Sequence, residues 1–133
     1  RRDKTLYCLD RLYHQENMDN YKVDVFLTDD GSTDGTSEAV CTKYSKVHII
    51  KGNGELYWNR GMYEAWKTAE KGDYDFYVWL NDDTFLFGNA LYGIDRNVLI
   101  YWEGIVLLLV PLVPKIITKR RLIVDLSERD LFQ

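Results

Sequence analysis

Two acidic loops carry the side chains of this sequence that are best suited to chemistry. The first is "TDDGSTDGT" at residues 28–36, and the second is "NDDT" at residues 81–84. Each follows a short apolar run that is typical of a buried strand. Adjacent carboxylates repel one another, and a divalent cation held by oxygen ligands relieves that repulsion. Asp82 and Asp83 are therefore candidates to bind Mg²⁺ or Mn²⁺ with a substrate diphosphate, the alternative being a polar turn that caps a helix.

The first loop does not have the pattern of a calcium site. An EF-hand loop that opened at Asp30 would need a closing Glu at position 41, which is Cys41, and a strand rather than a helix precedes it. The carboxylates of Asp29 and Asp30 could instead accept hydrogen bonds from N–H groups of a ligand, which the neighbouring glycines allow to approach closely. The alternative is an ordinary helix start in which Thr33 and Asp34 serve as caps.

The sequence between the acidic loops adds a third polar group. The loop "GNGE" runs into an expected helix, and a helix N-terminus favours anions. It is not a Walker loop, because the Gly-Lys-Ser/Thr ending is absent. Asn59, Arg60 and Gly61 stand at the start of that helix and are of interest only as a group. Trp58 and Trp66 are expected to belong to the core rather than to stack on a ligand.

Helical and strand-like patterns alternate along the first two thirds of the chain. Strands separated by single helices imply right-handed parallel crossovers and a sheet covered by helices on both faces. Ligands of such folds bind outside the carboxyl ends of the strands, so the two acidic loops are expected to share one crevice. The expected helices cover residues 3–17, 34–44 and 57–71, the last with Gly72 as its C-terminal cap, and the expected strands cover residues 22–28, 46–51 and 74–80.

Length, charge and cysteine content limit the function classes. The 133 residues are enough for one domain with a substantial core. A net charge of −4 argues against a nucleic-acid-binding domain, which needs a basic face for phosphate contacts. Cys8 and Cys41 lack metal-ligand spacing and are expected to be two buried free thiols in a reducing compartment. No signal peptide is recognisable, so a cytoplasmic location is expected.

The motifs and their order resemble glycosyltransferase family 2. The resemblance covers roughly residues 1–92 and is carried by "VFLTDDGSTDGTSEAV", then "NRG", then "FYVWLNDDTFLF". It implies an α/β fold of the GT-A type, with a Rossmann-like nucleotide-binding sheet flanked by helices. It also implies transfer of a sugar from a nucleotide-diphospho-sugar donor to a hydroxyl of a growing glycan or a lipid-linked acceptor. The cofactor that it implies is Mn²⁺ or Mg²⁺.

The resemblance assigns roles to both strand-end loops. Asp30, with Asp29 beside it, falls on the position that contacts the nucleotide base of the donor. The "NRG" group falls near the donor at the start of a helix. In the second loop Asp83 falls on the metal position of a D-x-D-like motif, and Asp82 supports it and also falls near the donor ribose or sugar. Asn81 stands where many members have Asp.

Both ends of the chain depart from the family pattern. The usual first strand, which ends in a loop that cradles the nucleotide, is absent ahead of the first expected helix, so we expect an incomplete domain with an open sheet edge. Residues 93–133 do not align with the acceptor region of the family, and they also fit an abnormal end of the gene product. The general base is therefore unassigned. We divide the chain into a nucleotide-sugar-binding region at residues 1–92 and an atypical apolar segment at residues 93–133 of the same domain.

The apolar segment contains a candidate membrane span at residues 98–117. Glu103, Pro111 and Lys115 interrupt it, and its longest uninterrupted apolar stretch, residues 105–110, is far shorter than the roughly 20 residues that a span needs. Buried strands or a patch on a membrane surface are favoured instead. Peripheral membrane contact and self-association are accordingly the interactions expected of this segment.

Besides a compact α/β module that binds nothing, which is the weakest alternative because both motifs occur in order, two further function classes stay open. A sugar nucleotidyltransferase would share nucleotide and metal binding, but its glycine-rich phosphate signature with Arg or Lys is absent. A non-catalytic nucleotide-binding remnant of a glycosyltransferase is the other class, since no acceptor region is recognisable. Binding of a nucleoside diphosphate with Mn²⁺, followed by donor hydrolysis, would separate these classes.

Overall fold

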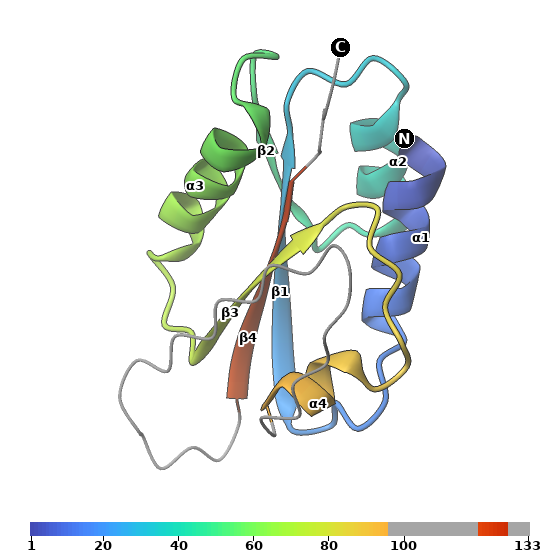
Figure 1. Cartoon of the computed structure of the whole chain (residues 1–133), viewed down its shortest axis with the longest axis vertical. Coiled ribbons are helices and arrows are strands. Elements are labelled where there is room, and N and C mark those ends of the chain that lie inside the picture. Colours follow the sequence, from blue (N-terminus) through green and yellow to red (C-terminus); the bar gives the residue numbers. More distant parts are fainter. Residues whose placement is uncertain (96–119, 128–133) are drawn as a thin grey trace.

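The structure, a computed structural model, describes residues 1–95 and 120–127 of the chain. Helices and strands alternate through most of this part, and Figure 1 shows helices on both sides of a central sheet. The α/β class is therefore confirmed. The helices are α1 (Arg2–Tyr13), α2 (Thr36–Lys43), α3 (Tyr57–Ala69) and α4 (Ala90–Asp95), and the strands are β1 (Tyr21–Asp29), β2 (His48–Lys51), β3 (Phe76–Asn81) and β4 (Arg120–Ser127).

The four strands form one parallel sheet in the order β2-β1-β4-β3. The strand β4 is not predicted from the sequence, and it comes from the segment that does not align with the family pattern. It pairs with β1 from Tyr21 opposite Arg120 to Thr28 opposite Ser127. If a strand preceded α1 and joined β1 by a right-handed crossover, it would pair with β1 on the side that β4 occupies. Because β4 occupies that place, β1 is paired on both sides, and the predicted open edge does not lie beside it.

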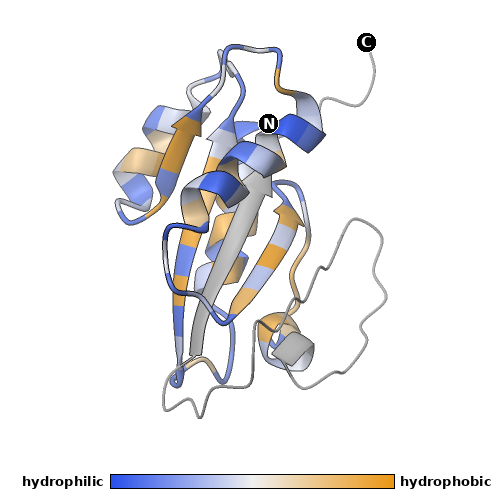
Figure 2. Ribbon diagram, turned by 90° about the vertical axis from the view of Figure 1, so that its left-hand side faces the viewer, coloured by the Kyte–Doolittle hydropathy of each residue, from blue (hydrophilic) through white to orange (hydrophobic). Residues whose placement is uncertain are grey.

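Two apolar clusters join the layers. On the face covered by α1 and α2, Val25 and Leu27 of β1 pack in one cluster with Leu9 of α1. On the opposite face Phe26 packs in a second cluster with Ala65 of α3. Successive side chains of a strand point to opposite faces, so β1 contributes to both clusters. Figure 2 shows hydrophobic positions concentrated on the strands. The acidic loops at the strand ends thus begin from a rigid, buried sheet.

Helix α1 ends at Tyr13, whereas the apolar spacing predicts a helix through residue 17. The cause lies in tertiary contacts of the residues that follow. The side-chain amide of Gln15 donates to the carbonyl of Phe87 at 2.5 Å, and its oxygen accepts from the backbone amide of Leu91 at 3.0 Å. These bonds draw the chain out of the helical path. They also hold the segment after the second acidic loop against α1.

Two smaller expectations are wrong. Helix α3 ends at Ala69 with Glu70 in the capping position, and Gly72 belongs to the following turn, where its amide donates to the carbonyl of Ala69 at 2.9 Å. Cys8 is buried and free as predicted, but Cys41 is free and exposed, because it lies on the outer side of α2.

Among residues 1–95 and 120–127, no helix is both long and apolar enough to cross a membrane. The apolar run at residues 98–117 lies outside the described residues. Glu103, Glu128 and Asp130, carboxylates of the unaligned segment that the sequence does not single out as a general base, lie outside them too.

Candidate functional site

Asp29 closes β1 and is buried, with 1% of its surface exposed. Its carboxylate accepts hydrogen bonds from the amide of Ser32 at 2.9 Å, from the hydroxyls of Ser32 and Ser37, and from the ammonium of Lys51 at 3.0 Å. Burial by itself raises the pKa of Asp29, but the bonds from Ser32, Ser37 and Lys51 outweigh it and hold the pKa below its usual range. Asp29 therefore stays charged and fixes the shape of the first loop.

Asp30 joins the first loop to the start of α3. Its carboxylate accepts three backbone N–H groups, from Gly54 at 2.7 Å, from Leu56 at 2.8 Å and from Tyr57 at 3.0 Å. Helix α3 has no side-chain cap of its own at Leu56. The first amides of a helix lack helical partners and carry partial positive charge, so a carboxylate is well suited to them. Asp30, which directly follows β1, thus caps the N-terminus of α3.

Two glycines allow this close contact. A Cβ atom on Gly52 would lie 2.3 Å from the carboxylate oxygen Oδ1 of Asp30, so any side chain at this position would displace that carboxylate. A Cβ atom on Gly31 would lie 3.2 Å from the amide nitrogen of Gly54, and Gly31 also has a φ of +80°. The loop after β1 and the loop after β2 therefore pack backbone against backbone. The two glycines therefore allow the two loops to pack closely, in addition to any close contact with a ligand.

Asp34 links the first loop to α1. Its carboxylate accepts from the amide of Thr36 at 3.1 Å, at the start of α2, and from the amide of Arg2 at 2.9 Å. The capping position of α2 itself is taken by Gly35, with a left-handed φ of 77°, so Asp34 caps the helix from one residue further out. The hydrogen bond from the Thr36 hydroxyl, together with those from the two amides, holds the pKa of Asp34 well below its usual range.

The second acidic loop begins with two buried side chains. The amide oxygen of Asn81 accepts from the indole N–H of Trp58 at 2.9 Å. Asp82 is 1% exposed, and its carboxylate accepts from the hydroxyl of Thr5 at 2.7 Å and from the guanidinium of Arg1 at 3.0 Å. Burial raises the pKa of Asp82, and the bonds from Thr5 and Arg1 offset only part of that effect. Asp83, in contrast, is exposed.

A cavity of about 330 Å³ opens beside this loop. It is lined by Asp82 and Asp83 of the loop and by Arg1 and Lys4 of the α1 region. The described residues contain no group of three or more His, Cys, Asp or Glu side chains that could hold a metal ion. The chemistry of this lining therefore fits a cation only when a ligand supplies further oxygen atoms to complete the shell. It fits an anion directly, through the two basic side chains.

The three residues of the "NRG" group differ in exposure because they lie on different sides of α3. Gly61 is buried, and its carbonyl accepts from the hydroxyl of Thr28 on β1 at 2.9 Å. Asn59 and Arg60 are exposed on the first turn of α3, next to the loop that Asp30 holds. Trp58 and Trp66 are each half-buried rather than fully buried.

The two acidic loops follow the carboxyl ends of β1 and β3. Among the described contacts, no hydrogen bond or ion pair joins Asp29 or Asp30 to Asp82 or Asp83. β4 separates β1 from β3. The Asp30 carboxylate binds the start of α3, and the Asp82 carboxylate binds Thr5 of α1. The first residues of α1 connect the two loops, through Arg2 to Asp34 and through Arg1 to Asp82. Among the described residues the two loops are thus joined through the start of α1, and the shared crevice stays a prediction.

Arg1, Lys4 and Thr5 are site residues that the sequence reasoning missed. A signal for them exists, because "RRDK" places three cations at the start of a helix. Cations are unfavourable there, since the helix dipole is positive at that end. Such a cluster indicates a carboxylate or an anionic ligand nearby, and the structure supplies Asp82 and the cavity.

Comparison with known proteins gives one result. Residues 1–100 match the family model described as glycosyl transferase family 2. No curated protein and no solved structure gives a significant match. The matched range includes both acidic loops and every site residue discussed above.

Proposed function

Since the chain belongs to glycosyl transferase family 2, we propose that it binds a nucleotide-diphospho-sugar and transfers the sugar to a hydroxyl of a glycan or a lipid-linked acceptor. The observation that carries the proposal is the cavity beside β3, in which two basic side chains face two carboxylates. A diphosphate is an anion that Arg and Lys recognise, and its oxygen atoms can complete the coordination of a divalent cation.

We assign the donor diphosphate to Arg1 and Lys4 and the metal-binding role to Asp83. Asp83 is the exposed carboxylate of the cavity, so one of its oxygens can reach a cation that the diphosphate also binds. Mn²⁺ or Mg²⁺ bound there would offset the negative charge of the departing nucleoside diphosphate. Asp82 is already engaged with Thr5 and Arg1, so its role is to hold the Arg1 guanidinium in the cavity.

The nucleotide base is assigned to the region around Asp30. Each carboxylate oxygen has two lone pairs, and Oδ1 of Asp30 accepts one backbone amide, that of Gly54. A base N–H group can bind the remaining lone pair. Asn59 and Arg60 are exposed beside the same loop and can contact the donor, while Asp29 and Gly61 are buried and position the strand and helix behind it.

Nucleotide binding without transfer is the second candidate function. In the described part of the chain, the carboxylates that line the cavity are Asp82 and Asp83. Both have a role already, so neither is free to deprotonate an acceptor hydroxyl. A remnant that binds the donor but lacks a general base would have this arrangement.

The test compares nucleotide binding with turnover. Calorimetry with UDP, TDP and GDP, each with and without Mn²⁺, measures binding to the whole chain and to Lys4→Met, with Lys46→Met as an exposed control. We expect Lys4→Met to weaken binding by roughly tenfold, since a charge-assisted bond contributes about 1.5–3 kcal/mol. Failure of every nucleoside diphosphate to bind would refute the proposal.

Release of nucleoside diphosphate from UDP-, TDP- and GDP-sugars then separates the two functions. Sugar transfer to an added acceptor supports the enzyme. Binding without release or transfer, under conditions in which the Lys4→Met variant still shows the predicted loss, supports the non-catalytic alternative.

A further inference from the structure

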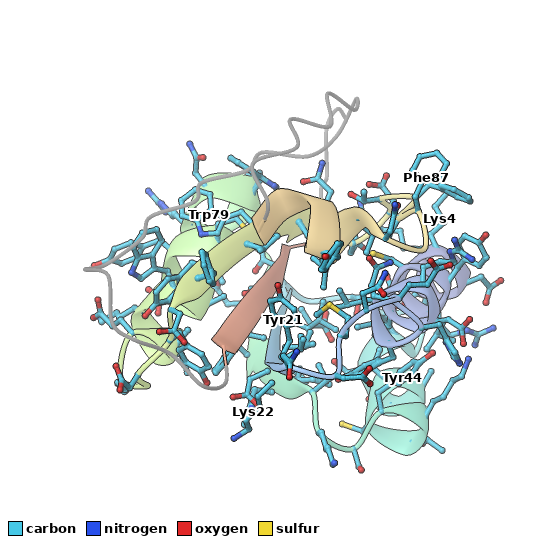
Figure 3. All side chains as sticks on the ribbon, turned by 90° about the horizontal axis from the view of Figure 1, so that it is seen from below. Lys4, Tyr21, Lys22, Tyr44, Trp79 and Phe87 are labelled. Carbon is cyan, nitrogen blue, oxygen red and sulfur yellow. The ribbon has the colours of Figure 1, made fainter. Side chains whose placement is uncertain are left out.

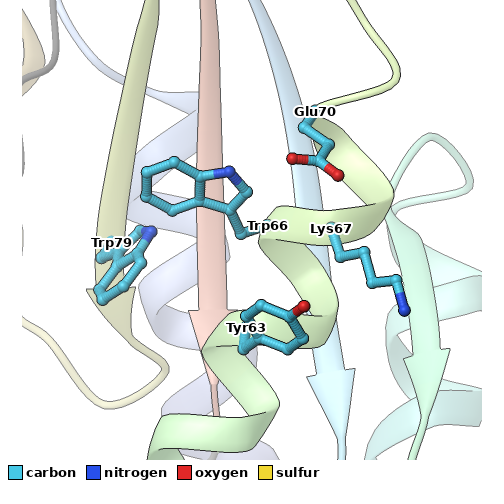
Figure 4. A pocket seen from close by; sticks show the side chains of 5 residues that line it. All are labelled: Tyr63, Trp66, Lys67, Glu70 and Trp79. Atoms are coloured by element: carbon cyan, nitrogen blue, oxygen red, sulfur yellow. The ribbon is translucent and has the colours of Figure 1, made fainter.

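The α3 side of the molecule contains a second cavity of about 330 Å³. Its lining comes from α3 and β3 and consists of Tyr63, Trp66, Lys67, Glu70 and Trp79. Figure 4 shows these side chains around the cavity, with Trp66 between Trp79 and the helix. Figure 3 shows Trp79 on the opposite side of the molecule from Lys4, so this cavity is distinct from the proposed donor site.

The helical residues of the cavity form one face of α3. Tyr63 and Lys67 of α3 and Glu70 in its C-terminal capping position follow one another at spacings of four and three residues, and Trp66 lies between them. Residues at this spacing project from the same side of a helix. The buried face of α3, which includes Ala65 and Ala69, packs on the sheet instead. Of the cavity face, Trp66 also packs against β3, whereas Tyr63 and Lys67 are exposed.

Trp66 presents one open face to the cavity. Tyr77 stacks on its other face, with ring centroids 5.4 Å apart and planes inclined by 12°. Trp79 meets it edge to face, at 5.4 Å and 82°. Trp66 and Trp79 are half-buried, and Tyr63 at the rim is 60% exposed. The result is a corner of two rings whose orientation is fixed by packing, next to a third ring that is freely accessible.

Lys67 and Glu70 line the edge of this cavity, and Figure 4 shows the Lys67 ammonium directed away from the two tryptophans. Within the described residues, neither the ammonium of Lys67 nor the carboxylate of Glu70 makes a hydrogen bond or an ion pair. One supplies three N–H donors and the other up to four acceptor sites. The two side chains carry opposite charges, so the lining as a whole has no net charge.

We propose that this cavity binds a sugar ring of a neutral glycan, as a subsite for a part of the acceptor chain that is remote from the reacting hydroxyl. A sugar ring has an apolar face of C–H groups, which suits the open face of Trp66, and a rim of hydroxyls, which suits Lys67 and Glu70. A lipid tail would leave that charged pair unsatisfied, and a phosphate would meet Glu70 as well as Lys67. The proposal rests on the proposed function for the view that the glycan is an acceptor.

The test uses the indole N–H signals of the whole chain in ¹⁵N NMR spectra, without donor or metal. The probes are neutral gluco-, galacto- and manno-oligosaccharides, and the signals are assigned with Trp66→Phe and Trp79→Phe. We expect the signals of Trp66 and Trp79 to shift with at least one of these oligosaccharides. Tyr63→Ala should weaken the affinity by about threefold to tenfold, since one aromatic contact is lost.

Tyr63 and Lys67 are exposed, so Tyr63→Ala and Lys67→Met test the cavity without risk to the fold. Tyr7→Ala is the matched control, because Tyr7 is an exposed tyrosine on α1. Absence of any shift at Trp66 or Trp79 would overturn the proposal, as would shifts that Tyr63→Ala and Tyr7→Ala change equally. Shifts caused by a nucleoside or a detergent alone would overturn it in favour of those ligands.

Nucleotide binding measured on the same samples keeps the two ideas separate. If the proposed function fails, nucleoside diphosphates do not bind, whatever the oligosaccharides do. If only the acceptor subsite fails, nucleotide binding persists while the signals of Trp66 and Trp79 stay unchanged.

Discussion

The carboxylate of Asp30 accepts the backbone amide of Leu56 at 2.8 Å, across 26 positions of the sequence. With the amides of Gly54 and Tyr57 it forms a three-bond cap on α3 that comes from the end of β1. The residue that the family resemblance assigns to the nucleotide base thus also organises the loop beside it. Base recognition and loop order are therefore expected to depend on each other.

Replacing Asp30 by Ala is expected to change both stability and nucleotide binding. The variant loses three charge-assisted bonds on partly exposed groups, which we expect to lower the free energy of unfolding by about 1–3 kcal/mol. Amide exchange of residues 54–57 should accelerate, measured by hydrogen–deuterium exchange. Nucleotide affinity should fall by roughly tenfold with or without Mn²⁺, since 1.4 kcal/mol corresponds to one decade.

Two variants serve as comparisons for Asp30→Ala. Asp34→Ala removes a cap of α2, so it should reduce stability and leave the amides of residues 54–57 and the nucleotide affinity unchanged. Gly52→Ala places a methyl group on the carboxylate of Asp30 and should reproduce the exchange phenotype of Asp30→Ala. If Asp30→Ala leaves amide exchange at residues 54–57 unaltered, the Asp30 carboxylate does not stabilise the start of α3 in solution.

The two neighbouring carboxylates of the second loop should separate stability from metal dependence. Asp82→Ala leaves the buried hydroxyl of Thr5 without its acceptor and should lower the melting temperature. Asp83→Ala removes an exposed side chain, so the melting temperature should stay unchanged while the enhancement of nucleotide binding by Mn²⁺ is lost. Calorimetry and thermal unfolding on both variants decide this, and an Mn²⁺ effect that survives Asp83→Ala contradicts the metal assignment.

Asp29 and Asp82 should affect the pH dependence of stability in opposite directions. The pKa of Asp29 is lowered from 3.8, so its contribution to stability is complete above 3.8 and is lost as pH falls through the lower folded-state value. The pKa of Asp82 is raised from 3.8, so stability is lost as pH rises from 3.8 through the higher folded-state value.

Urea unfolding between about pH 3 and pH 7 measures these contributions. Relative to the wild type, Asp29→Asn should be most destabilised at the neutral end of this range, and Asp82→Asn should be most destabilised at the acidic end. Parallel stability curves for the wild type and both variants would show that neither carboxylate has a shifted pKa.

The two cysteines should differ strongly in reactivity. Burial, with the charge of Asp82 nearby, raises the pKa of the Cys8 thiol to about 12, whereas Cys41 is exposed on α2. A thiol reagent near neutral pH should therefore modify one cysteine quickly, and Cys41→Ser should abolish that reaction. The second equivalent should react only on unfolding, and fast double labelling of the native protein would contradict the burial of Cys8.

The position of the site residues could be predicted from the sequence, but their partners could not. Apolar runs that end in acidic residues place Asp30 and Asp83 at the carboxyl ends of parallel strands, and the structure has both there. The bonds of Asp30 to Leu56 and of Asp82 to Thr5 join residues 26 and 77 positions apart. Sequence periodicity reports the local environment of a residue, so it contains no information on such contacts.

The sequence by itself determined the alternation of helices and strands, the α/β class and the family, because hydrophobic period and turn residues act over a few neighbouring positions. Tertiary structure alone decided that β4 pairs between β1 and β3, that α1 stops at Tyr13, and that Arg1 and Lys4 face Asp83 across a cavity. These outcomes depend on which distant groups satisfy one another's hydrogen bonds and charges. That choice is made only when the whole chain packs, since a buried polar group must find its partner wherever the fold places one.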